Sequence, residues 1–78
     1  MSEYVALFEK YEVDAKWFEE HYEELVKLYD GEFVAVFGRR VVDHDKTLRK
    51  LMKRIETAFP AEEVFVEYVT SRKLQFVL

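Results

Sequence analysis

The stretch that decides the fold is residues 31–44, GEFVAVFGRRVVDH. A run of β-branched and aromatic residues around one alanine occupies 33–37, and a second short run at 40–43 follows the pair Gly38-Arg39. Residues of these types favour strands. A glycine in the first of two loop positions suits a type II′ turn, because that turn needs a positive φ there. The stretch therefore predicts a β-hairpin.

A two-residue loop also fixes the register of this hairpin. The expected pairs are Phe37 with Arg40, Val36 with Val41, Ala35 with Val42, Val34 with Asp43 and Phe33 with His44. Both faces of the first strand are then apolar, with the odd-numbered residues of 33–37 on one face and the even-numbered on the other. Such a strand is usually central, and something other than water covers each side.

Apolar residues that recur at intervals of three and four predict three helices. Ser2 can cap the first, Asp14 can cap a second over about 15–29, and Asp45 can cap a third, which ends at Pro60. Gly31 is placed to end the second helix in a left-handed conformation. The apolar faces consist of Tyr4, Leu7, Phe8 and Tyr11; of Trp17, Phe18, Tyr22, Leu25, Val26 and Tyr29; and of Leu48, Leu51, Met52, Ile55 and Phe59.

Two more strands are predicted at 64–69 and 73–78, the second of which can also be a continuation of the first. The order α-α-β-β-α-β-β predicts an α+β fold with helices packed on a small, mostly antiparallel sheet. Because the connection through the third helix is long, the third strand can return beside the first, in the order 2-1-3-4. We expect one domain over 1–78, with an accessory helix at 1–13 and a C-terminal strand at 73–78.

The composition limits the class of protein. Of the 78 residues, 50% are hydrophobic and 17% aromatic, and none is cysteine, so packing alone must stabilise a small core. The absence of cysteine fits a reducing compartment. We find no secretory signal pattern and no apolar run near the roughly 18 residues that span a bilayer. We expect a soluble cytoplasmic protein that has no contact with membranes.

One pattern runs through the middle of the chain. A tryptophan that opens a helix is followed by L-x-x-x-Y-x-G-E-F-V-A-V, a turn with glycine, and V-V-x-H. The matching residues are Trp17, Leu25, Tyr29, Gly31, Glu32, Phe33, Val34, Ala35, Val36, Val41, Val42 and His44. The pattern, over residues 16–69, resembles a small prokaryotic family of domains of unknown function. Such domains tend to carry glycine at the position of Asp45. The resemblance implies a fold unit and no activity.

Residues 43–45, Asp-His-Asp, have the types of a metal site or an acid–base pair, since a carboxylate can orient an imidazole. Consecutive strand residues point to opposite faces, however, so the three cannot bind one ion without a bend. The alternative is that His44 packs on Phe33 and hydrogen-bonds locally. His21, one turn before Glu24, falls short of a ligand set and reads as the polar border of the second helix.

The sequence has no glycine-rich phosphate loop and no nucleophile elbow, and it lacks cysteine. These are the local patterns that would indicate group transfer or covalent hydrolysis. We therefore expect a protein that is not an enzyme, with no catalytic residue, cofactor or metal.

The charge of the chain is unevenly divided. Residues 1–36 hold 10 acidic and 3 basic side chains, net −7, and residues 37–78 hold 6 acidic and 9 basic, net +3, which sum to −4. The basic side chains on the third helix can form a phosphate-binding face for nucleic acid. Alternatively they form an ordinary solvated face that pairs with the acidic helices. The residues are Lys46, Arg49, Lys50 and Lys53, joined by Arg39, Arg40 and Arg54.

These observations favour a small non-enzymatic interaction or accessory domain that forms a homodimer, or binds another protein, through an edge strand or the N-terminal helix. One alternative is a nucleic-acid-binding accessory protein that uses the basic third helix. Another is a metal or acid–base site at His44. Within the hairpin, packing leaves only Arg39, Arg40 and His44 unexplained.

Overall fold

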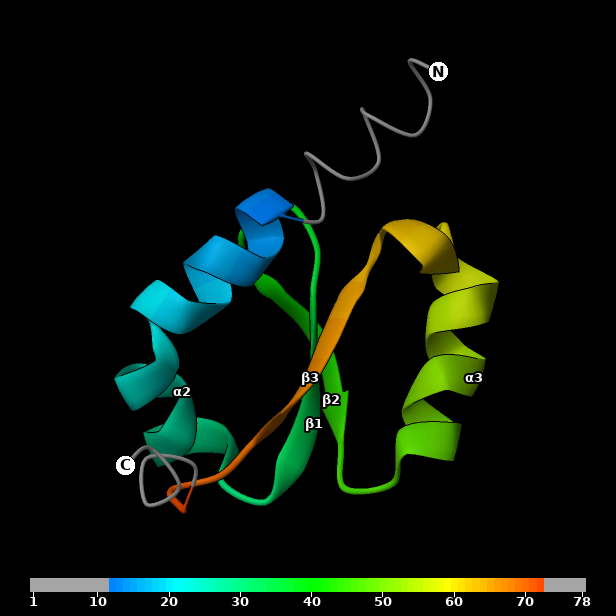
Figure 1. Cartoon of the computed structure of the whole chain (residues 1–78). Helices are drawn as coiled ribbons and strands as arrows, with labels where there is room; N and C mark the ends of the chain where they lie inside the picture. Colours follow the sequence, from blue (N-terminus) through cyan, green and yellow to red (C-terminus); the bar gives the residue numbers. More distant parts are fainter. Residues whose placement is uncertain (1–11, 73–78) are drawn as a thin grey trace.

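The computed structural model describes residues 12–72 (Figure 1). The predicted first helix with its cap Ser2 and the predicted strand at 73–78 lie outside these residues. Residues 12–20 are helical, and the other elements follow in the order that the sequence predicts. They are α2 (Tyr22–Tyr29), β1 (Glu32–Val36), β2 (Val41–Asp45), α3 (Leu48–Ala58), the short 3₁₀ helix η1 (Ala61–Glu63) and β3 (Phe65–Val69).

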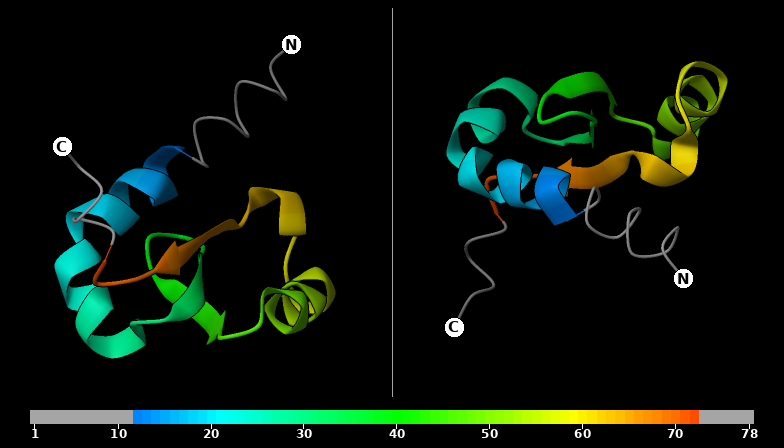
Figure 2. Two further views of the ribbon diagram at one scale, coloured as in Figure 1. Left: turned by 60° about the horizontal axis from the view of Figure 1, so that its bottom comes forward. Right: turned by 90° about the horizontal axis from the view of Figure 1, so that it is seen from above.

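The described residues form three layers, and the predicted α+β class is confirmed. The helical residues 12–20 and α2 cover one face of the sheet, and α3 covers the other (Figures 1 and 2). The sheet has three antiparallel strands in the order β2-β1-β3. The order of the first three strands is thus as predicted, with β1 in the middle, whereas the described sheet has three strands and not four.

Strand β1 is buried on both faces, as its sequence predicts. Val34, Ala35 and Val36 are completely shielded from solvent. The two valines pack in a cluster that includes Phe18, Leu25, Phe65 and Val69, on the side of α2. Ala35 packs on the other side with Leu51, Ile55 and Val64. Removing this much apolar surface from water is the main term that stabilises so small a domain.

The hairpin turn differs from the expected type. Gly38 has a φ of 67° and Arg39 a φ of 59°, so both loop residues are left-handed. Two positive φ values define a type I′ turn, and the predicted type II′ turn is wrong. Only glycine adopts this conformation without steric cost, so Arg39 is held there by its surroundings. The loop closes as a two-residue turn, with Phe37 N–H donating to the Arg40 carbonyl at 3.0 Å.

The register is correct at the turn and wrong beyond it. Val36 pairs with Val41 as expected, but Ala35 pairs with Asp43 because Val42 is inserted as a β-bulge. The remaining expected pairs are therefore shifted by one residue, to Val34 with His44 and Phe33 with Asp45. A bulge adds one residue to one strand only, and alternation by itself gives no sign of it.

The two expected aspartate caps are also wrong. Asp14 lies inside the helical segment 12–20, where its side chain is buried and its Oδ1 accepts a hydrogen bond from Arg39 N–H at 2.8 Å. Asp45 is the last residue of β2, and the N-cap position of α3 is Thr47. The predicted helix over 15–29 is interrupted by a turn at His21. Its end at Gly31, with a φ of 86°, is as predicted.

Asp14 ties the hairpin tip to the helical layer. Asp14→Ala should lower the free energy of unfolding by about 1–3 kcal/mol, because it leaves the Arg39 N–H without this acceptor. Asp14→Asn keeps a carbonyl oxygen at the same position and should cost clearly less. Urea unfolding of the three proteins measures the difference. Equal losses for alanine and asparagine would show that the hydrogen bond to Arg39 is not what Asp14 contributes.

Candidate functional site

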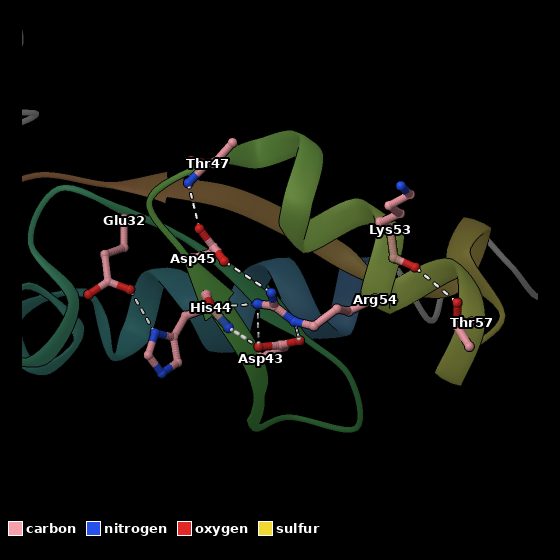
Figure 3. A network of polar contacts seen from close by, with 8 residues as sticks. All are labelled: Glu32, Asp43, His44, Asp45, Thr47, Lys53, Arg54 and Thr57. Atoms are coloured by element: carbon pink, nitrogen blue, oxygen red, sulfur yellow. Dashed lines mark hydrogen bonds and ion pairs between the residues drawn. The ribbon is translucent and has the colours of Figure 1, made fainter.

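A polar network joins β2 to α3, and its centre is Arg54 (Figure 3). The guanidinium binds Asp43 with two hydrogen bonds, from Nε to Oδ2 at 2.9 Å and from Nη2 to Oδ1 at 3.1 Å. It also donates to Asp45 Oδ2 at 3.0 Å and to the His44 carbonyl at 3.1 Å. The planar guanidinium is suited to this two-point binding of a carboxylate. We call Arg54, Asp43 and Asp45 the arginine clasp.

The bulge at Val42 makes this arrangement possible. Without the extra residue, Asp43 would lie opposite Val34, on the face that packs against α2. With it, Asp43 and Asp45 lie opposite Ala35 and Phe33, on the face that carries α3 and Arg54. One inserted residue therefore moves two carboxylates to the side of their cation, since a shift of one residue reverses every side chain of a strand.

The clasp changes the protonation of its members. Hydrogen bonds from Arg54 lower the pKa of Asp43, with a further contribution from the backbone N–H of His44. For Asp45, the Thr47 N–H is the main cause of a lowered pKa, and Arg54 adds to it. The two carboxylates in turn raise the pKa of Arg54. All three side chains keep contact with water, so the clasp is a surface network and not a buried ion pair.

His44 lies on the opposite face of β2 from the two aspartates. Its Nδ1 donates to Glu32 Oε1 at 2.6 Å, and its ring packs against Tyr29 with centroids 4.6 Å apart. The expected neighbour Phe33 pairs with Asp45 instead. A carboxylate that holds one imidazole nitrogen is a common part of acid–base and metal sites. Sequence reasoning missed Glu32 as the partner because only the bulge brings His44 to its face.

The candidate metal ligands do not converge on one point in the structure. Within residues 12–72, no group of three or more histidine, aspartate or glutamate side chains is arranged to hold a metal ion. His21 Nδ1 donates to the Trp17 carbonyl at 2.8 Å, and its ring stacks on the indole. His21 thus stabilises the turn between the two helical segments. The partner of its Nδ1 is the Trp17 carbonyl and not Glu24.

The predicted basic residues separate into three groups. Arg54 is engaged in the clasp. Arg39 and Arg40 lie at the exposed hairpin tip, and the Arg39 backbone is bound to Asp14 in the helical layer across the sheet from α3. Only the remaining four share the outer side of α3 and the turn before it, where they are exposed and form no ion pair with any described residue. We call these four the α3 basic row: Lys46, Arg49, Lys50 and Lys53.

The two edges of the sheet differ in chemistry. Strand β2, at one edge, carries the bulge and ends in Asp-His-Asp, whose two aspartates bind Arg54. Strand β3, at the other edge, reads Phe-Val-Glu-Tyr-Val and has no described strand beyond it. Tyr68 on this edge is 43% exposed and packs against Phe33 with ring centroids 4.9 Å apart.

A comparison with protein families identifies the fold unit. The model of a family of unknown function, DUF5678, matches residues 24–72. The chain belongs to this family. The match supports the resemblance seen in the sequence, and it includes the clasp, His44 and the α3 basic row. Compared with the expected boundaries of 16–69, the DUF5678 match leaves out Trp17 and extends three residues beyond β3.

Two other comparisons add nothing to this assignment. Searches of curated proteins and of solved structures gave no significant match. Within the described part of this DUF5678 protein, none of the helices has the length and apolar character needed to cross a bilayer.

The clasp predicts a dependence of stability on pH. Because folding lowers the pKa of Asp43 and Asp45, the clasp stabilises the folded state above the unfolded pKa of aspartate, near 4, and this stabilisation is lost as pH falls through the folded values. Arg54→Gln should lower the urea midpoint at about pH 7 and much less at about pH 2. The matched control is Lys53→Gln, a neighbour outside the clasp. A loss for Arg54→Gln that is the same at both pH values would contradict the ionic role of Arg54.

Proposed function

We propose that this protein is a non-enzymatic interaction domain that self-associates into a homodimer through the edge of β3, beyond which the described residues place no strand. The observation that supports the proposal is the contrast between the two sheet edges. Unpaired edges bind other strands unless charge, bulges or cover prevent it. Strand β2 has a bulge and two aspartates, whereas β3 has one charged residue, Glu67, among its five.

The geometry of such a dimer follows from the sheet. Two β3 strands that pair antiparallel about a two-fold axis would join two three-stranded sheets into one of six strands. Each copy would then offer the same surface to the other, which is the closed, isologous contact of most dimers. Tyr68 would lie near the axis, where its exposed ring adds apolar area to the backbone hydrogen bonds.

The non-enzymatic part of the proposal rests on the arrangement of the polar residues. Within the clasp, Arg54 binds Asp43 and Asp45. His44 forms a separate pair with Glu32 at the surface. Neither His44 nor Glu32 lines any of three hollows on the described surface. Because the chain has no cysteine to oxidise, we place the domain in the reducing cytoplasm.

Sedimentation velocity tests the edge contact. The wild-type protein should be dimeric at about 10–100 µM, a range typical of weak dimers. Tyr68→Lys should shift the protein toward monomer by at least about tenfold in dissociation constant, because it places a charge on the open edge. Tyr68→Phe keeps the ring and should leave the dimer unchanged. A wild-type protein that is monomeric throughout this range, or a Tyr68→Lys protein that is as dimeric as wild type, would refute the edge contact.

A second candidate function is nucleic-acid binding by the α3 basic row. The observation in its favour is that these four cations are exposed and free of ion pairs with described residues, while Arg54 is neutralised separately. Cations spaced along one helix side can follow successive phosphates, and each contact releases counterions. The basic row is only a small part of a net acidic chain, so this binding would be weak and strongly dependent on salt.

Charge reversal on the two helical layers tests this candidate. Lys50→Glu with Lys53→Glu should abolish any binding of a fluorescent oligonucleotide at about 20 mM salt, because two phosphate contacts become repulsive. The matched control is Lys16→Glu with Lys27→Glu, which makes the same change in net charge on the other layer. If neither wild type nor the control binds, or if both double variants bind alike, the basic row is not a nucleic-acid site.

A further inference from the structure

The outer faces of the two helical layers carry opposite charge. Helix α2 and the segment before it expose Glu19, Glu20, Glu23 and Glu24, together with Lys16 and Lys27. The outer side of α3 exposes Arg49, Lys50 and Lys53, with Glu56 as the one acidic residue of that helix. The sheet lies between the layers, so the acidic and basic faces of one molecule point in opposite directions (Figure 1).

The acidic face carries an unusual apolar residue. Leu28 is 70% exposed, more than any other large apolar side chain among the described residues. It lies one helical turn after both Glu24 and the buried Leu25, so its side chain projects from the flank of α2 next to Leu25. A leucine in this position contributes little to the core, since most of its surface remains in water. We call it the Leu28 knob.

The basic face carries a matching depression. A shallow, mainly apolar hollow of about 430 Å³ is lined by Lys53, Arg54, Thr57 and Ala58. We call it the α3 hollow. Its volume is ample for the four carbon atoms of one leucine side chain. Arg54 is held at its wall by the clasp. The other basic side chains at its border are Lys53 and, one helical turn earlier, Lys50.

We infer that the α3 hollow binds the Leu28 knob of a second copy of this chain. The apolar knob fills the apolar hollow, while Glu24 beside the knob meets Lys50 and Lys53 beside the hollow. This combination of an apolar anchor with a charged border is the usual anatomy of a protein interface. Opposite charges bring the two faces together and disfavour contact between like faces.

The symmetry of this contact differs from that of the proposed edge dimer. Knob and hollow are different surfaces on opposite sides of one molecule, so the contact is head-to-tail and leaves a free knob and a free hollow at the two ends. It therefore builds open chains of copies, and in a protein dimerised through β3 it would link dimers. The inference uses α2 and α3 only and does not rest on the edge contact.

Complementation of two variants tests the inference by sedimentation velocity. Wild type should form a concentration-dependent series of oligomers at about 0.1–1 mM and low salt, because an interface this small is weak. Leu28→Ser removes the knob, and Ala58→Arg fills the hollow at an exposed residue. In the Tyr68→Lys background, which removes the edge contact, each variant alone should be monomeric, with association weakened at least about tenfold. An equal mixture should give a 1:1 heterodimer and nothing larger, since only one knob and one hollow remain.

The control variant is Val13→Ser, which removes another exposed apolar side chain, 49% exposed, from the same layer. It should associate like its parent. The inference is overturned if the parent stays monomeric at about 1 mM, which would leave the hollow to a different protein or to nucleic acid. It is also overturned if the mixture stays monomeric, or if Val13→Ser weakens association as much as Leu28→Ser. Circular dichroism of each variant confirms that it is folded.

Discussion

The rest of the structure depends on the burial of β1. Val34, Ala35 and Val36 are three consecutive residues without solvent exposure, and consecutive residues of a strand face opposite sides. Both faces of the sheet must therefore be covered, and two helical layers do so: residues 12–29 on one side and α3 on the other. The three-layer arrangement is the direct consequence of this apolar strand.

The bulge at Val42 then determines which polar residues meet. It places Asp43 and Asp45 toward Arg54, and His44 toward Tyr29 and Glu32. The same stretch that suggests a metal or acid–base site in the sequence is thus divided between two faces of the sheet. Asp43 and Asp45 connect β2 to Arg54 of α3. His44 forms a surface pair with Glu32. Residues 43–45 therefore have partners on both sides of the sheet.

Covering β1 from both sides also distributes the charge of the molecule. The acidic residues of the helical segment 12–29 lie on one outer layer, and the basic residues of α3 lie on the opposite one. Among the described residues, the two sheet edges remain: β2 carries a bulge and two aspartates, and β3 carries one charged residue, Glu67. The candidate functions of this small domain therefore concern the outer faces of its two helical layers and the two edges of its sheet.

The sequence by itself determined the fold class, the order of the elements, the central place of β1 and the family resemblance, because these follow from local propensity and from the period of apolar residues. It also identified the basic residues of α3. The tertiary structure alone decided the bulge, the type I′ turn and the burial of Asp14. It alone decided the pairing of His44 with Glu32, and the removal of Arg54 from the basic row by the clasp. Each of these depends on a contact between residues at least nine positions apart or on one inserted strand residue, and no local pattern in the chain encodes either.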